Sequence, residues 1–140
     1  YRKGGALLKL NGEPKTIWAS QNMHNQLNSS VLIGKHLYGI SGQNGHGADL
    51  RCVEFETGKV LWRDRSVGKG SVAYADGHLY VLSEDNVVGL VEASPEGYRE
   101  KGRFTIADQG WPAWAHPVVS GGRLYVRNQN VLASYDVRAK

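Results

Sequence analysis

The sequence predicts an all-β protein built as a β-propeller, and three observations support this prediction. The 140 residues include 18 Gly and 7 Tyr among many short apolar runs, and no window keeps a helical period. Similar segments recur along the chain, and their tyrosines, Tyr38, Tyr80 and Tyr125, lie 42 and 45 residues apart. A second series is offset from the first, with Trp18 and Trp62 lying 44 residues apart. A period of this length with four strands per repeat is the signature of propeller blades.

The inner half of each blade is expected to be a Val-rich strand, a glycine-containing turn and a strand that carries the repeated tyrosine. The Val-rich runs are residues 30–33, 71–74 and 117–120. The turn-and-tyrosine segments that follow them are residues 34–41, 76–83 and 121–128. Glycine-containing dipeptides at these junctions are typical of tight hairpin turns, so the sequence predicts three inner hairpins.

The outer half of each blade is expected to be a second hairpin, and its best copy is Cys52–Trp62, read as C-V-E-F-E-T-G-K-V-L-W. Residues 56–59 form a tight turn between two apolar runs, and Gly58 is the position expected to need a positive φ. In the third copy Phe104, 42 residues beyond Trp62, is expected to replace the tryptophan. The related copies are residues 6–18, 50–65 and 87–106 and, as a first strand only, residues 131–137.

We expect one partial propeller domain over residues 1–140, holding about three blades. Its parts are the outer hairpin of a first blade, two full blades and a last blade without its outermost strand. The expected bounds are residues 1–20, 28–66, 69–107 and 115–138. Propellers usually close with four to eight blades, and an open end exposes an apolar sheet face. We therefore expect either the C-terminal part of a longer propeller or self-association that completes a ring. Tyr1 is not expected to be a native translation start.

Charge and composition argue against several classes of function. The net charge is +4, but the Lys and Arg residues are scattered without a basic block, so no nucleic-acid partner is expected. No apolar run approaches the ~20 residues of a membrane span. The single cysteine, Cys52, lies within an apolar strand. It is expected to be a small buried core residue rather than a reactive thiol.

The outer hairpin of the second blade resembles the tryptophan-docking motif A-x-D-x-x-T-G-x-x-x-W of quinoprotein-like (PQQ-like) β-propeller repeats. Thr57, Gly58 and Trp62 match the motif, whereas Cys52 and Glu54 replace its Ala and Asp. Weaker copies in other blades match at Trp18, Ala133 and Asp136. The resemblance covers nearly the whole chain and implies a propeller with repeats of the broader WD40 and YVTN-like kind.

The resemblance also implies roles for these residues. In that family the tryptophan packs between adjacent blades and the Thr-Gly turn lies on the outside, so Trp18, Trp62, Thr57 and Gly58 are expected to be structural. Tryptophan suits this place because it buries a large area and still gives its N–H to a carbonyl. Many members are non-catalytic and resemble periplasmic scaffolds of outer-membrane protein assembly or sensor domains of receptors. The favoured function is therefore a scaffold or protein-interaction module of a bacterial protein, in the periplasm or otherwise outside the cytoplasm, whose partners are proteins or other blades of the propeller.

The alternative function is that of a fragment of a quinoprotein dehydrogenase acting on alcohols or sugars. Such members hold pyrroloquinoline quinone with calcium, and use an acidic base, calcium-binding carboxylates and often a vicinal Cys pair. This chain has one Cys and no recognisable carboxylate cluster of that kind. No cofactor is expected under the favoured function, and pyrroloquinoline quinone with calcium is expected only under the alternative. No Ser-His-Asp or Cys-His arrangement can be read from residue order, so no catalytic residue is assigned.

The most unusual segment is the aromatic loop Trp111–Pro117, read as W-P-A-W-A-H-P. It leads into an innermost strand, and innermost strands begin near the central channel, where ligands bind. Residues at the aligned starts of these strands are a candidate ligand or partner site at the channel mouth. They are Asn28, Lys69, Trp114 and His116. The competing interpretation is that the loop only packs between blades.

No metal site is expected from the histidines and aspartates. His36 and His78 occupy equivalent turn positions one blade apart, and His46 lies in a glycine-rich loop over residues 41–47. Neither pattern has the spacing of metal ligands. Asp49 and Asp85 are possible calcium ligands, but a calcium site needs several converging oxygens.

Overall fold

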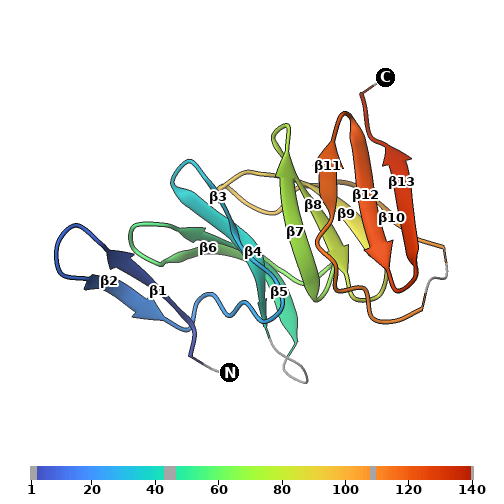
Figure 1. The fold of residues 1–140 in the computed structure, drawn as a ribbon. Helices are drawn as coiled ribbons and strands as arrows, with labels where there is room; N and C mark the ends of the chain where they lie inside the picture. The colour runs from blue at the N-terminus through green and yellow to red at the C-terminus, as the bar shows by residue number, and fades with distance from the viewer. Residues whose placement is uncertain (1–2, 43–46, 108–109, 140) are drawn as a thin grey trace.

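The protein is all-β in the computed structural model, which describes residues 3–42, 47–107 and 110–139. Within these residues thirteen strands form antiparallel sheets of four, four and three strands and one two-stranded hairpin. The sheets stand side by side in chain order, as blades do in a propeller (Figure 1). The predicted fold class, four-stranded antiparallel blades in a partial ring, is confirmed. The loop with His46 lies outside the described residues.

The first two blades follow the predicted hairpins closely. The first blade contributes a hairpin of β1 (Gly5–Lys9) and β2 (Lys15–Ser20). The second is a full sheet of β3 (Val31–Ile33), β4 (His36–Gly42), β5 (Ala48–Glu54) and β6 (Val60–Asp64). Cys52 lies on β5, the third strand of the second blade, and is fully buried, so its predicted place in the core is confirmed.

The last two blades repeat this order. The third blade consists of β7 (Gly70–Ala75), β8 (His78–Ser83), β9 (Val87–Glu92) and β10 (Glu100–Thr105). The fourth consists of β11 (Val118–Ser120), β12 (Arg123–Asn128) and β13 (Val131–Asp136). In each sheet the strands pair in chain order, so β3, β7 and β11 are the innermost strands.

The core lies between the blades rather than on one side of a sheet, and β8 shows why. Its residues Leu79 and Val81 are fully buried in a cluster shared with the second blade. Tyr80 and Leu82 point to the opposite face and join Leu124 of the last blade in a second cluster. Because successive residues of a strand face opposite sides, a strand buried on both faces is apolar throughout. Fully burying each such side chain contributes about 1.5–3 kcal/mol.

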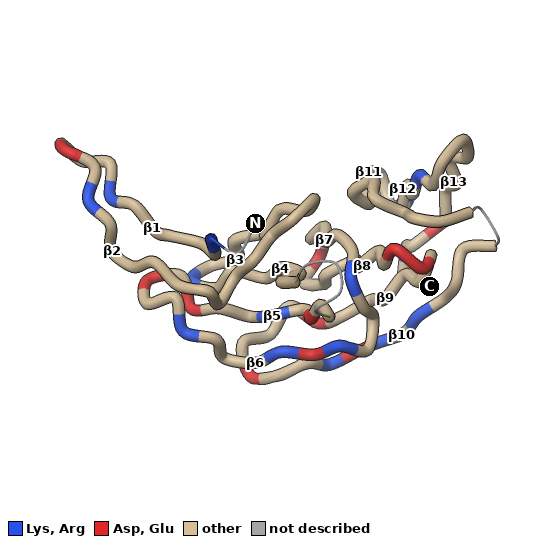
Figure 2. The backbone as a smooth tube through the Cα atoms, turned by 90° about the horizontal axis from the view of Figure 1, so that it is seen from below, with Lys and Arg blue, Asp and Glu red and all other residues tan. Residues whose placement is uncertain are grey.

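Antiparallel order divides the connections of the blades between two ends of the molecule. The turns within the inner and outer hairpins lie at one end, here called the turn end. The connections from the second to the third strand, and from one blade to the next, lie at the opposite end, here called the loop end. The described loop-end segments include residues 21–30, 65–69, 84–86 and 110–117. Charged residues of both signs alternate along the outer strands and turns, without one basic face (Figure 2).

A register shift in each outer hairpin defines equivalent positions in three blades. Trp18 pairs with Leu7 beside the shift in the first blade, and Trp62 pairs with Cys52 beside the shift in the second. In the third blade the residue beside the shift is Gly102, which pairs with Leu90. Phe104 lies two residues further along, so it does not occupy the tryptophan position as predicted. Counting by a fixed period fails here because the β8–β9 connection is shorter than the β4–β5 connection.

Candidate functional site

The loop end brings three of the four predicted site residues together. Asn28, Lys69 and Trp114 line one small depression between the second, third and last blades, together with Leu27 and Glu84. The depression has a volume of about 10 Å³. A space of this size holds at most one water molecule. The predicted channel-mouth residues therefore form a compact surface cluster rather than a pocket for a substrate.

Glu84 is the centre of this cluster. Its Oε1 lies 2.7 Å from Lys69 Nζ and accepts a hydrogen bond of 2.7 Å from Trp114 Nε1. Its backbone N–H donates to the Lys69 carbonyl at 2.7 Å, and its carbonyl accepts from Ala113 N–H at 3.1 Å. Hydrogen bonds to an ionised carboxylate are stronger than neutral ones. The side chains of Lys69 and Glu84 are only 17% and 14% exposed, so the pair is held in one arrangement.

Sequence reasoning missed Glu84 because it lies in the short polar turn Ser83-Glu84-Asp85-Asn86, which reads as an ordinary connection. A positional signal was available. Glu84 follows directly after the tyrosine-bearing strand of its blade, and such strands all end at the loop end. The residue at the same place in the last blade is Gln129, whose side chain donates to the Pro112 carbonyl at 3.0 Å. Both positions therefore hold the aromatic loop.

His116 does not line the depression but ties the aromatic loop to the second blade. The Ser29 N–H donates to His116 Nε2 at 3.2 Å, which requires a neutral imidazole with its proton on Nδ1. Ser71 Oγ donates to the Ala115 carbonyl at 3.2 Å, and Asn28 Nδ2 donates to the Gly70 carbonyl at 2.9 Å. These bonds join the segments that precede three innermost strands. Asn28 and His116 thus hold the starts of the innermost strands of three blades together at the loop end.

Two tryptophans of the same loop face solvent. Trp111 is 67% exposed and Trp114 is 53% exposed, and Leu27 beside Trp114 is 51% exposed. Exposed aromatic surface beside fixed polar groups is typical of sites that contact other proteins. We call Leu27, Lys69, Glu84 and Trp114 the loop-end patch. Its chemistry offers aromatic area and a fixed ion pair, and no arranged nucleophile and base.

The tryptophans of the outer hairpins lie at the seams between blades. Trp18 Nε1 donates to the Phe55 carbonyl of the second blade at 2.9 Å, and Trp62 Nε1 donates to the Ser94 carbonyl of the third blade at 2.8 Å. Gly58 has a φ of 71°, and a Cβ there would lie 2.8 Å from Trp18 Cδ2. Thr57 Oγ1 accepts from Lys59 N–H at 3.2 Å inside the turn.

Asp49 and His78, weighed as metal ligands on the sequence alone, have partners within the chain. Asp49 forms an ion pair with Arg51 at the start of β5. His78 lies at the turn end, where its Nδ1–H donates to the Asp76 carbonyl at 2.7 Å. Across residues 3–42, 47–107 and 110–139, no three His, Cys, Asp or Glu side chains gather so as to hold a metal ion.

The buried thiol and a seam tyrosine are both held in their neutral forms. Burial raises the pKa of the Cys52 thiol, so it is a poor nucleophile. Burial, and then the Glu100 carboxylate that accepts its hydrogen bond, raise the pKa of Tyr98 to about 12.

In the described part of the chain no helix has the length and apolar character needed to cross a membrane.

Comparisons with known proteins agree with the geometry. A PQQ-like family model, described as outer membrane protein assembly factor BamB, matches residues 46–139. Among solved structures 33 chains match, including the crystal structure of BamB from Moraxella catarrhalis. That match has a TM-score of 0.62 and 14% identity, and covers 86% of this chain and 33% of the other. The chain thus spans about a third of the length of that structure. None of the curated proteins matches significantly.

Proposed function

The chain belongs to the PQQ-like family of outer membrane protein assembly factor BamB, as the motif resemblance predicted, and from this membership we propose that it is a non-catalytic scaffold module that binds another protein. The observation that carries the proposal is the loop-end patch. There the half-exposed ring of Trp114 stands beside a fixed ion pair, and the space between them admits no substrate. The partner is a polypeptide that buries the indole ring.

The geometry favours a protein over a small molecule for three reasons. Binding energy at protein interfaces concentrates in a few residues, and Trp is among the most frequent of them. Trp114 is already held by its hydrogen bond to Glu84, so little side-chain freedom is lost on binding. Finally, a small-molecule site needs a concave pocket, and the depression here is about 10 Å³.

We also propose that this module works outside the cytoplasm, in the periplasm, and the description of the matching family as an outer membrane protein assembly factor supports this. Further blades of the same propeller, or other copies of this chain, are the partners expected at the open sheet faces. The Val118 side chain on the innermost strand β11 and the Leu132 side chain on β13 are 53% and 67% exposed, which supports contacts there.

Photo-crosslinking in cells tests the patch directly. A photoreactive residue at position 114 is expected to give a specific protein adduct. The matched position 56, in an exposed turn at the turn end, is expected to give none. Against the purified crosslinked protein, Trp114→Ala should weaken binding about thirtyfold or more, as loss of a hot spot does, while Glu56→Ala leaves binding unchanged. Unchanged affinity of the folded Trp114→Ala variant would overturn the proposed site.

A second measurement tests the absence of catalysis. The protein is mixed with pyrroloquinoline quinone and calcium, and dye-linked oxidation of alcohols and sugars is followed. We expect no turnover above the same mixture without protein. Reproducible turnover that depends on the added quinone would replace the scaffold proposal with the quinoprotein dehydrogenase alternative.

A further inference from the structure

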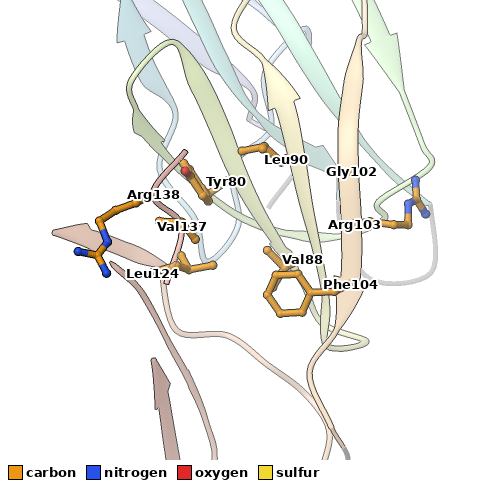
Figure 3. A pocket seen from close by; sticks show the side chains of 9 residues that line it. All are labelled: Tyr80, Val88, Leu90, Gly102, Arg103, Phe104, Leu124, Val137 and Arg138. Carbon is orange, nitrogen blue, oxygen red and sulfur yellow. The ribbon is translucent and has the colours of Figure 1, made fainter. Parts of the chain in front are cut away.

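The seam between the third and last blades contains a cavity of about 290 Å³. Tyr80, Val88 and Leu90 line it from the third blade, and Leu124 and Val137 line it from the last. Figure 3 shows these side chains and the Phe104 ring around the space, with the guanidinium groups of its two arginines turned away from it. The cavity is thus apolar within and charged only at its rim.

This cavity lies at the seam position that tryptophan fills elsewhere in the chain. Trp18 and Trp62 occupy the residue beside the register shift of the outermost strand, and each ring crosses to the next blade. The third blade has Gly102 at that residue, and Gly102 lines the cavity. A Cβ added to Gly102 would meet no heavy atom within 4 Å. The missing side chain therefore accounts for the open space.

The walls of the cavity also match those of a filled seam. Tyr38 flanks Trp62 in the second blade, with ring centroids 6.1 Å apart, and Tyr80 is its counterpart by register. Phe55, whose carbonyl accepts the Trp18 N–H, corresponds to Val137 in the last blade. Both residues donate their own N–H to an inner-hairpin turn, at 2.8 and 3.0 Å. The cavity therefore has an aromatic wall, and Val137 holds the chain position of the residue whose carbonyl binds Trp18, whereas Trp62 uses the carbonyl one residue further along, that of Ser94.

The two arginines at the rim already bind carboxylates of the chain, so the apolar interior suits an uncharged ligand. Arg103 is held by Glu100 through bonds of 2.5 and 2.6 Å, and it also donates to the Ser66 carbonyl at 3.1 Å. Arg138 donates to Asp136 Oδ1 at 3.0 Å. Anionic ligands would have to displace these carboxylates. A flat, neutral ring with one N–H donor suits both the wall and the rim.

We propose that this seam cavity binds an indole ring supplied from outside the chain. The ring replaces the tryptophan that Gly102 lacks, packs against Tyr80 and donates its N–H toward the Val137 carbonyl. Apolar protein cavities of about 150 Å³ take up benzene, so the larger bicyclic ring fits this volume. Two sources carry the same chemistry: a free indole-type molecule, or a tryptophan side chain in a peptide.

Titration with indole, and separately with the peptide Gly-Trp-Gly, tests the proposal by amide NMR. We expect saturable shifts for residues 88, 102, 124 and 137 with at least one of the two probes. Binding of indole alone identifies a small molecule as the ligand, and binding of the peptide identifies a polypeptide. Naphthalene, which lacks the N–H, should bind about fivefold more weakly than indole. No saturable shift with either probe would overturn the proposal.

Substitution at one residue provides the matched controls. Gly102→Trp should fill the cavity from within and abolish binding of both probes. Gly102→Ala adds only a Cβ in open space and should keep it. If Gly102→Trp does not fold, Val137→Phe narrows the same cavity from the last blade and should weaken binding at least tenfold. Retained binding in a folded variant of either kind would show that the probes bind elsewhere and would refute the assignment.

Discussion

Truncation of Trp62 tests how the blades are joined. Its ring lies 6.1 Å from the ring of Tyr38 in its own blade and 6.1 Å from that of Tyr98 in the next, and its N–H donates to the Ser94 carbonyl. Trp62→Ala removes a partly buried ring worth about 2 kcal/mol of transfer free energy, a hydrogen bond worth about 1 kcal/mol and aromatic contacts of about 0.5 kcal/mol or more. We therefore expect a loss of about 3–4 kcal/mol in the free energy of unfolding.

Urea unfolding followed by far-ultraviolet circular dichroism measures this loss. Trp62→Phe keeps a ring but removes the N–H and part of the area, and should cost about 1–2 kcal/mol. The matched control is Trp111→Ala, a change at a ring 67% exposed, which should cost less than about 0.5 kcal/mol. A loss below about 1 kcal/mol for Trp62→Ala, or losses of equal size at positions 62 and 111, would refute the seam argument.

Three further predictions concern a turn, the thiol and the carboxylates. Gly58→Ala forces a Cβ onto the Trp18 ring at a φ of 71°, so urea melts should show a loss of about 1–2 kcal/mol or more; Gly97→Ala, which meets no neighbour, should be near neutral. Native Cys52, buried and with a raised pKa, should react with a thiol reagent only after unfolding, and rapid native labelling would contradict its burial. Hydrogen bonds from Lys101 and Arg103 lower the pKa of Glu92 and Glu100, respectively, so their stabilisation is present above about pH 4.5 and is lost as acid protonates the folded carboxylates. The melting temperature should therefore fall as the pH drops below about 4.5, and it should fall less steeply in the double variant Glu92→Gln/Glu100→Gln. An equal fall in the variant and the native protein would show that these two carboxylates do not contribute to the acid sensitivity.

The strands could be predicted because their signals are local. Tyr38, Tyr80 and Tyr125 all fall in the second strand of a blade, and glycine turns precede each of them. The position of Phe104 could not be predicted in the same way. Its register depends on the lengths of two connections and on a bulge, and a fixed period averages over all three. Spacing therefore locates the strands, but it does not show which residue of a strand faces the neighbouring blade.

The sequence predicts which end of the molecule holds the candidate site, but it does not predict which side chains contact one another there. Aligning the starts of the inner strands selected Asn28, Lys69 and Trp114, which the structure indeed brings together. Glu84, which binds both Lys69 and Trp114, comes from a different connection of the third blade. Polar turns are common, so the composition of this turn does not single out Glu84, although its place directly after the tyrosine-bearing strand puts it at the loop end. Contacts between connections need the antiparallel geometry, which places both kinds of loop at one end.

Gly102 links the architecture of the chain to its proposed ligand. Beside the cavity the third seam still has a packed core without tryptophan, because Tyr80, Leu82 and Leu124 pack between its blades and the ring centroids of Phe104 and Tyr135 lie 4.8 Å apart. Since a side chain at position 102 meets open space, a larger residue would fill the cavity, and filling cavities commonly stabilises proteins by about 0.5–2 kcal/mol. Sites that give up stability of this kind are frequently sites of binding. Gly102→Trp should therefore raise the free energy of unfolding while removing indole binding. A folded Gly102→Trp variant with unchanged or lower stability would show that a side chain at position 102 does not fill the cavity.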